Sequence, residues 1–371
     1  MKTDTILNHA VAGKWLSVEE AVRLFYEVPL PGLMQAAHTV RKMIHSESEV
    51  SWIIDRNVNY TNICNSGCKF CNFFRTAQHP EGYIINFNDL CTRTEEMFRA
   101  GGRQLLLQGG MNPKLGLDYF VTLFRQLKKR FPLLKLHALG PPEIVHLSRI
   151  ESLAFADTLK LLINAGLDSL PGAGGEILAD RVRKIVSPVK CSADEWLEVM
   201  HEAHKLDLTT TATMMFGHVE TISERMEHLV RLREVQRQKP EQSTGFIAFI
   251  LWPFQDESTV LIRSTGKRYK TSTEEYVRMV AISRLMLPNI RNIGASWLTV
   301  GVAAGQVSLW AGANDFGSVM MEENVVSVAG ANHSMDARGM QRAISQAGFR
   351  PLLRDQQFNY YPSGSYDTEG L

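Results

Sequence analysis

Cysteine is scarce in this chain, which has only five among its 371 residues. An odd and clustered set of cysteines argues against the disulfide framework of a small secreted protein. The first twenty residues lack the apolar core of a signal peptide, and no run of about eighteen apolar residues could cross a membrane. We therefore expect a cytoplasmic protein in which cysteine serves metal or redox chemistry.

An excess of charge of either sign is also missing. Forty Lys and Arg residues stand against 39 Asp and Glu residues, which gives a net charge of +1. A chain this close to neutral has no broad field to attract nucleic acid or an anionic membrane, so the expected partner is a small molecule. With 44% hydrophobic residues and no low-complexity tract, the sequence is typical of a globular protein with a large core.

After residue 50, short β-rich runs alternate with longer helical ones, as in repeated βα units around a parallel sheet. We predict seven strands, within residues 51–60, 104–110, 134–139, 166–172, 209–218, 244–254 and 290–297. Residues 305–325 could supply an eighth unit, which would close an α/β fold of the (β/α)8 TIM-type barrel class. The main alternative is a doubly wound sheet, but no G-x-G-x-x-G follows the first strand.

Three segments are expected along the chain. Residues 1–48 are predicted to form an N-terminal helical cap, residues 49–350 the barrel, and residues 351–371 a loose C-terminal tail. Within the barrel, Asn88 is predicted to cap a helix that Gly101 ends. Further helices are expected near residues 117–130, 155–165, 193–206, 221–238 and 273–287.

Cys64, Cys68 and Cys71 lie in one short segment, NYTNICNSGCKFCNFFR, after the first predicted strand. Thiolates are soft ligands, so this loop could hold zinc or an iron–sulfur cluster. Structural zinc sites are closed by four ligands, and the remaining cysteines, Cys91 and Cys191, are interpreted as small buried residues. A four-iron cluster held by three cysteines keeps one iron open to bind a substrate or cofactor.

The spacing C-x3-C-x2-C, with the aromatic Phe70 before the last cysteine, resembles the signature of the radical S-adenosylmethionine (SAM) superfamily. The resemblance implies a [4Fe-4S] cluster on the three cysteines, with SAM bound at the open iron and cleaved by one electron to a 5′-deoxyadenosyl radical. It also implies an external one-electron reductant such as flavodoxin or ferredoxin. A loop after the first strand would lie at the C-terminal face of the barrel, where barrel active sites are built.

Two glycine-containing segments are candidates for holding SAM, and the resemblance places Phe70 beside the same cofactor. Gln108, Gly109 and Gly110 follow the second predicted strand, where the superfamily carries a glycine-rich segment that approaches the cofactor closely. Two adjacent glycines can also mark only a turn. Glu176 follows a glycine run at a predicted helix start, so it either holds polar groups of the cofactor or only stabilises its own helix.

Histidines and acidic residues near strand ends are candidates for substrate contact and proton transfer. His137 and His218 are predicted to face the mouth of the barrel, and His137 is expected to contact the substrate together with Asn314. His218, Asp315 and Glu322 are candidates for taking the final proton of the reaction. Asp315 could instead cap a turn, and Glu322 could only begin a helix.

Other polar residues are given structural roles or a place on the barrel wall. Thr209, Thr211 and Thr213 alternate along one predicted strand, so their hydroxyls could face the barrel interior. His201 and His204 have helical spacing without a third ligand nearby, and we interpret them as surface or packing residues.

Longer segments resemble the menaquinone-pathway and deazaflavin-pathway branch of the superfamily, over roughly residues 20 to 350. These segments are LLLQGGMNP, PPEI, LPGAGGEILADRVR, ATMMFGHVET and GANDFGSVMMEENVVSVAGA. The last is more similar to the futalosine-pathway cyclases than to the aminofutalosine synthases or the FO synthase subunit. One departure is HALGPPEI, where a segment such as HSFSPPEI is expected, so hydroxyl contacts are not carried over to Ala138 and Gly140.

This resemblance implies a specific reaction on dehypoxanthine futalosine. The deoxyadenosyl radical would take hydrogen from the sugar C4′, the carbon radical would attack the attached benzoate ring, and loss of an electron and a proton would leave a spiro-fused precursor of menaquinone. The alternatives are a radical-addition enzyme of the same branch and, from another class, an iron–sulfur electron carrier. A carrier would hardly need several hundred residues of βα units with polar strand ends.

Overall fold

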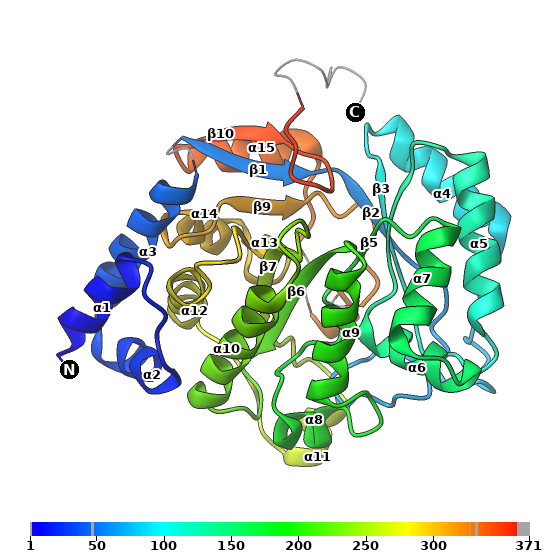
Figure 1. Cartoon of the computed structure of the whole chain (residues 1–371), viewed down its shortest axis with the longest axis horizontal. Coiled ribbons are helices and arrows are strands. Elements are labelled where there is room, and N and C mark those ends of the chain that lie inside the picture. The colour runs from blue at the N-terminus through cyan, green and yellow to red at the C-terminus, as the bar shows by residue number, and fades with distance from the viewer. Residues whose placement is uncertain (1, 46–47, 326, 331–332, 362–371) are drawn as a thin grey trace.

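The computed structural model describes residues 2–45, 48–325, 327–330 and 333–361, and its strands form one all-parallel sheet (Figure 1). The strands are β1 (Glu49–Ile53), β2 (Asp55–Asn59), β3 (Gln104–Gln108), β4 (Lys135–Ala138), β5 (Ser169–Leu170), β6 (Thr209–Phe216), β7 (Phe246–Pro253), β8 (Asn292–Gly294), β9 (Asp315–Ser318) and β10 (Arg350–Leu353). Their order in the sheet is β10-β1-β9-β8-β7-β6-β5-β4-β3-β2.

The sheet closes because its first strand is used twice. β1 and β2 form one extended run interrupted at Ile54, and β1 pairs with β9 whereas β2 pairs with β3. Counting β1 and β2 as one position and adding β3 to β9 gives the eight positions of a TIM-type barrel, so the predicted fold class is confirmed. All seven strands expected before residue 300 are present, and the eighth lies within residues 305–325 as predicted.

Helices cover the outside of the sheet. They are α4 (Phe87–Arg99), α5 (Leu117–Arg130), α6 (Pro141–Glu151), α7 (Phe155–Ala165), α8 (Asp180–Val186), α9 (Ala193–Lys205), α10 (Ile222–Gln238), α11 (Val260–Thr265), α12 (Thr273–Met286), α13 (Trp297–Val300), α14 (Val302–Trp310), α15 (Ala337–Gln346) and a 3-10 turn at Ser327–Ala329. The expected cap of α4 was wrong by two residues, because Asn86, not Asn88, accepts the capping bond from Asp89. No described helix is long and apolar enough to cross a bilayer.

Three helices precede the barrel: α1 (Thr3–Val11), α2 (Val18–Glu27) and α3 (Leu30–Ile44). They pack against α10, α12 and α14 on one flank of the barrel (Figure 1). Arg41 of α3 is fully buried and donates to the carbonyls of Ala313 (2.9 Å) and Glu49 (2.6 Å), at the amino ends of β9 and β1. The helical segment therefore covers part of the amino-terminal end of the barrel, and its boundary at residue 48 stays a prediction.

The C-terminal segment is not loose where the structure describes it. β10 extends the sheet beside β1, from Glu49 opposite Arg350 to Trp52 opposite Leu353. Beyond β10, Gln357 accepts a hydrogen bond from Thr209 at the start of β6 (3.0 Å). The prediction of a loose tail was wrong for residues 351–361, which cross the amino-terminal end of the barrel; residues 362–371 lie outside the described part.

Candidate active site

The cysteine loop follows β2 and is held on two sides by short helices. The amide of Lys69, inside the loop, donates to the carbonyl of Val186 at the end of α8 (2.8 Å). The carbonyl of Lys69 accepts from the amide of Leu261 in α11 (2.8 Å), and Figure 1 shows α8 and α11 together at the same end of the barrel. The loop therefore lies at the carboxyl end of the first strand.

The three thiols differ in their surroundings. The sulfur of Cys64 accepts hydrogen bonds from two backbone amides, at 3.3 and 3.4 Å. Burial raises the pKa of Cys68 to about 11, against the opposing effect of Lys190, and burial also raises the pKa of Cys71. Metal ligation requires thiolates. Bound iron would supply the positive charge that these buried sulfurs need in order to ionise.

The loop offers three thiols to a four-iron cluster. Within the described ranges, no group of three His, Cys, Asp or Glu side chains is arranged to hold one ion. A [4Fe-4S] cluster needs no such convergence, since each cysteine binds a different iron. Cys91 and Cys191 are buried free thiols, as predicted, in α4 and just before α9.

A cavity of about 120 Å³ adjoins the loop, and Phe70, Cys71 and Glu176 border it. Glu176 is buried and ion-paired with Lys190 (2.7 Å) and Arg183 (3.6 Å), yet its Oε2 atom has no hydrogen-bond partner. Burial acts to raise the pKa of Glu176, but the two cations outweigh burial and lower it. An ionised carboxylate that borders the cavity beside the cysteine loop fits the ammonium group of SAM.

The local backbone gives Glu176 a role other than capping. The interpretation that it stabilises its own helix is wrong, because α8 begins four residues later, at Asp180. The φ angle of Glu176 is +32°, in a region that residues other than glycine rarely adopt. Such strain is found at ligand sites when surrounding contacts hold it, and here the two ion pairs do so.

The glycines after β3 permit a close approach of chain segments. A Cβ atom on Gly109 would lie 2.7 Å from the ring of Tyr60, and one on Gly110 would lie 2.2 Å from the carbonyl oxygen of Ile63. Glu143 accepts hydrogen bonds from the Gly109 amide (3.1 Å) and the Tyr60 hydroxyl (3.0 Å), and burial raises its pKa to about 7. Contact of this segment with SAM stays a prediction.

A larger cavity of about 360 Å³ occupies the barrel lumen. Trp252 and Val325 border both this cavity and the smaller one beside the cysteine loop. Gln108, at the end of β3, also borders the lumen. The two cavities therefore adjoin, with the cysteine loop at one end of the pair and the C-terminal segment at the other.

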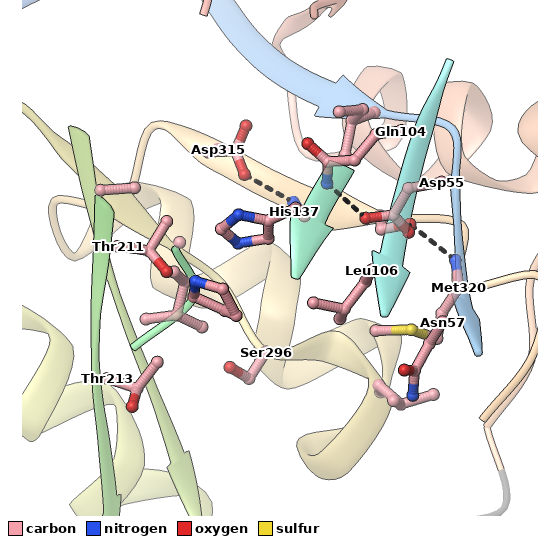
Figure 2. Close-up of a pocket in the computed structure, with 18 of the residues that line it drawn as sticks. Asp55, Asn57, Gln104, Leu106, His137, Thr211, Thr213, Ser296, Asp315 and Met320 are labelled. Carbon is pink, nitrogen blue, oxygen red and sulfur yellow. Dashed lines mark hydrogen bonds between the residues drawn. The ribbon is translucent and has the colours of Figure 1, made fainter. Parts of the chain in front are cut away.

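The lumen wall carries the hydroxyls expected from the sequence. Thr209, Thr211 and Thr213 of β6 all line it, and Figure 2 shows the last two facing Asn57 and Leu106 across the cavity. Two of these hydroxyls already form hydrogen bonds within the protein. The Thr211 hydroxyl accepts from the amide of Gly172 (3.0 Å), and the Thr213 hydroxyl donates to the carbonyl of Gly172 (2.5 Å). The threonines thus position the loop after β5.

Two of the predicted substrate and proton-transfer residues line the lumen. His137 does so with Nδ1 2.5 Å from the Ser169 hydroxyl, and burial lowers its pKa to about 3, so its ring is neutral. Asp315 also lines the lumen, and Figure 2 shows it close to His137. Its carboxylate is held by Arg354 (2.6 and 3.0 Å), by the Ser51 hydroxyl (2.6 Å) and by the Gly317 amide (3.0 Å). These four donors occupy most of the lone pairs of the carboxylate.

Three other predicted residues do not border the described lumen. His218 is buried, with Nε2 3.0 Å from the carbonyl of Met215 and Nδ1 accepting from the amide of Val219. Glu322 points to the outer side of the sheet, where it pairs with Arg56 (3.0 Å) and Arg93 of α4.

Asn314 is the third of these residues, and it has a structural position. Its side-chain oxygen accepts from Arg284 (2.8 Å) and from the amide of Ile293 (2.9 Å), and its nitrogen donates to Asn292 (2.9 Å). Asn314 therefore joins β8 to β9, and its predicted substrate contact has no support in this arrangement.

Asp55 is a functional candidate that sequence reasoning missed. It lines the lumen and accepts hydrogen bonds from Gln104 (2.8 Å) and from the Ser318 hydroxyl. Burial raises its pKa, against these two bonds. The signal was present in the sequence, because Asp55, Asn57 and Asn59 alternate along the first strand and so share its inward face.

Comparisons with known proteins agree with this geometry. Residues 58–232 match the family model described as Radical SAM superfamily, and residues 243–366 match the CofH/MqnC C-terminal region. The chain is 39% identical to the cyclic dehypoxanthine futalosine synthase of Halalkalibacterium halodurans over 96% of this chain and 95% of the relative. It is 36% identical to the aminodeoxyfutalosine synthase of Thermus thermophilus over 94% of this chain and 93% of the relative.

The chain therefore belongs to the radical SAM superfamily, in the group of enzymes that includes the cyclic dehypoxanthine futalosine synthases. Enzymes of this superfamily use a [4Fe-4S] cluster and SAM, and the chain is an enzyme of this kind. Among solved structures, methylornithine synthase has the same fold, with a TM-score of 0.70 at 18% identity over 93% of this chain and 97% of that protein.

Proposed function

We propose that the chain closes a ring in dehypoxanthine futalosine to form cyclic dehypoxanthine futalosine, a step of menaquinone biosynthesis. The observation that carries the proposal is the pair of adjoining cavities, one beside the cysteine loop and one in the lumen, with Trp252 and Val325 bordering both. A substrate that holds both of its reacting carbons needs one enclosed chamber beside the cofactor. The similarity to enzymes named for this product supports the same assignment.

The protein's own residues bind the cofactors and enclose the substrate. Cys64, Cys68 and Cys71 would hold the cluster, and Glu176 would hold the ammonium group of SAM. When bound, this pair supplies a radical that removes one hydrogen atom from the substrate. The lumen wall then keeps the sugar carbon against the benzoate ring and excludes water and other hydrogen donors.

In the last step the cyclised substrate would lose one proton to a base and one electron to an oxidised one-electron centre, either the cluster or its protein partner, and the aromatic ring would be restored. We propose Asp55 as the proton acceptor in place of His218, Glu322 and Asp315. Asp55 lines the lumen and accepts two hydrogen bonds, so its carboxylate keeps free lone pairs. Its burial raises the pKa toward the working pH, where a general base is most effective.

We also propose an external one-electron reductant, such as flavodoxin or ferredoxin, and a place for it. The helices α8 and α11 that hold the cysteine loop carry the exposed cations Lys184 and Arg263, and Lys267 and Lys270 follow α11. Within the described chain none of these four forms an ion pair, so they are available to an acidic partner.

A second candidate is radical addition, because the Thermus thermophilus relative carries the name of an adding enzyme. One experiment separates the two. Reconstituted protein is incubated with SAM, dithionite and dehypoxanthine futalosine deuterated at C4′. The cyclase assignment predicts deuterium in the released 5′-deoxyadenosine and one SAM cleaved per cyclic product. Adenosine carbon bound covalently in the product would reject it in favour of the adding enzyme.

The same assay tests the proton acceptor. Asp55→Asn keeps the shape of the side chain but cannot take a proton at neutral pH. We expect this variant to release deuterated 5′-deoxyadenosine while forming at least about tenfold less cyclic product, in line with the usual size of general-base effects. Equal product from Asp55→Asn and the unchanged chain would remove Asp55 from the mechanism.

A further inference from the structure

The loop between α8 and α9 places a lysine ammonium against the cysteine loop. The Nζ atom of Lys190 lies 5.2 Å from the centre of the Phe70 ring, and Phe70 stands between two of the cluster cysteines in the sequence. The same atom lies 2.7 Å from Glu176, and the side chain of Lys190 is only 15% exposed. The amide of Lys69 donates to the carbonyl of Val186, which joins the cysteine loop to the end of α8 (2.8 Å). A cation is therefore fixed beside the cysteine loop.

Lys190 is more than the counter-ion of Glu176. Arg183 also pairs with that carboxylate (3.6 Å), so the three side chains together carry one net positive charge. Burial acts to lower the pKa of Lys190, but the charges of Cys68 and Glu176 outweigh burial and raise it, so the ammonium stays protonated. The site thus holds positive charge that Glu176 does not cancel.

This charge acts on two of the cysteines. Burial raises the pKa of Cys68, and Lys190 opposes burial with a larger effect than Glu176 exerts in the other direction. At Cys71 burial again raises the pKa, and Lys190 opposes it together with two backbone hydrogen bonds. A cation that stabilises thiolates also stabilises the added electron of a cluster bound to them, because both changes add negative charge at the same place.

We propose that Lys190 raises the reduction potential of the [4Fe-4S] cluster and so brings it within reach of the external one-electron reductant. In that step the reductant loses one electron and the cluster gains it, and no bond is made or broken. The potentials of such clusters depend on net charge and burial, and a buried charge is screened by salt much less than a surface charge. The inference rests on the family assignment and on the need for a reductant, not on the identity of the substrate.

The potential is measured on protein with a full cluster but without SAM or substrate. The electron paramagnetic resonance signal of the reduced cluster is followed during titration with dithionite and redox mediators. Lys190→Met removes the charge and keeps the length of the side chain. It should make reduction about tenfold less favourable, which lowers the midpoint by about 59 mV for one electron.

Two further variants control for charge and for loss of an ion pair. Lys190→Arg keeps the charge and should keep the midpoint near that of the unchanged chain. Lys128→Met is the matched control, since Lys128 of α5 also pairs with a carboxylate, that of Asp168 (2.5 Å), but contacts the carbonyl of Leu134 just before β4 and not the cysteine loop. It should leave the midpoint unchanged. The shift in Lys190→Met should persist in high salt, unlike an effect of surface cations.

Glu176→Gln gives the opposite sign, since loss of the carboxylate should raise the midpoint. The double variant of Lys190→Met with Glu176→Gln leaves no unpaired carboxylate, so it tests Lys190 even if the single variant binds less iron. Its midpoint should lie below that of Glu176→Gln by the same tenfold change in the reduction equilibrium. An unchanged midpoint in Lys190→Met with only weaker SAM binding would show that Lys190 serves the cofactor's carboxylate, and would overturn the inference. Equal midpoints in Glu176→Gln and the double variant would overturn it as well. Either failure leaves the cyclase assignment intact, because no substrate takes part.

Discussion

Gly110 links the segment after β3 to the cysteine loop. A Cβ atom at this position would lie 2.2 Å from the carbonyl oxygen of Ile63 and 2.8 Å from the Cβ atom of Cys64. The backbone atoms of Ile63 cannot rotate away as a flexible side chain could. Even one methyl group on Gly110 must therefore move the first cluster cysteine.

We expect Gly110→Ala to lose most of its cluster. Displacement of Cys64 disturbs one of three ligands, so iron bound per chain after reconstitution should fall by at least half. Gly32→Ala is the control, because its added Cβ would meet only Val28, at an ordinary 3.4 Å, within α3. Full iron content and unaltered cluster absorbance in Gly110→Ala would contradict this reading of the loop.

Glu143 makes the stability of the site depend on pH. Burial raises its pKa from 4.5 to about 7, so the folded chain binds this proton more tightly than the unfolded chain does. The resulting stabilisation is complete below the unfolded value near 4.5 and is lost as the pH rises through about 7. A shift of this size corresponds to roughly 3 kcal/mol.

The expected result is a difference between two pH profiles. The thermal midpoint of the unchanged chain should fall between pH 5 and pH 8 relative to that of Glu143→Gln, which cannot ionise but keeps an oxygen for the Gly109 amide and the Tyr60 hydroxyl. Parallel profiles for the two proteins would show that another group carries the pH dependence.

Local spacing predicts residues whose role is local. Three cysteines in eight residues and alternating threonines on one strand could both be identified from the sequence, and the threonines line the lumen as expected. His218, Asn314 and Glu322 could not be assigned in this way. The ring of His218 bonds to Met215 and Val219 close by in the chain, whereas the partners of Asn314 and Glu322 lie on other strands and helices, so only the folded chain shows that their polar atoms are already bonded.

At the scale of elements, the repeated βα pattern could be predicted because each unit is encoded within about forty residues. β10 could not, since this four-residue strand pairs with β1 across some 300 residues. For the same reason the sequence did not predict that residues after β10 border the amino-terminal end of the lumen. Arg354 and Gln356 reach the lumen only when the chain returns to the amino-terminal end of the barrel.

At the scale of the whole molecule, near-zero net charge conceals a local separation of charge. Residues 181–192 and 260–272 contain four Lys or Arg residues each and no Asp or Glu. These stretches include most of α8 and α11, the two helices that are hydrogen-bonded to the cysteine loop. Composition could not indicate which of these cations reach the surface next to the cluster site: Lys184, Arg263, Lys267 and Lys270 are exposed and form no ion pair among the described residues, whereas Arg183 and Lys190 pair with Glu176.

We expect this surface to serve the protein reductant and not the chemistry. Arg263→Glu combined with Lys267→Glu should slow turnover driven by reduced flavodoxin about tenfold or more at low ionic strength, because rim charges mainly set association rates. The loss should shrink with added salt, which screens exposed charges over about 10 Å at 0.1 M. Turnover driven by dithionite, a small anion that needs no docking surface, should be unchanged.

Arg125→Glu with Lys129→Glu makes the same change of charge on α5, where both side chains are exposed, and should leave both rates as they were. If the α11 variant lost activity equally with dithionite, the substitutions would have damaged the cluster loop; if it kept full activity with flavodoxin at low salt, the reductant would have to dock elsewhere.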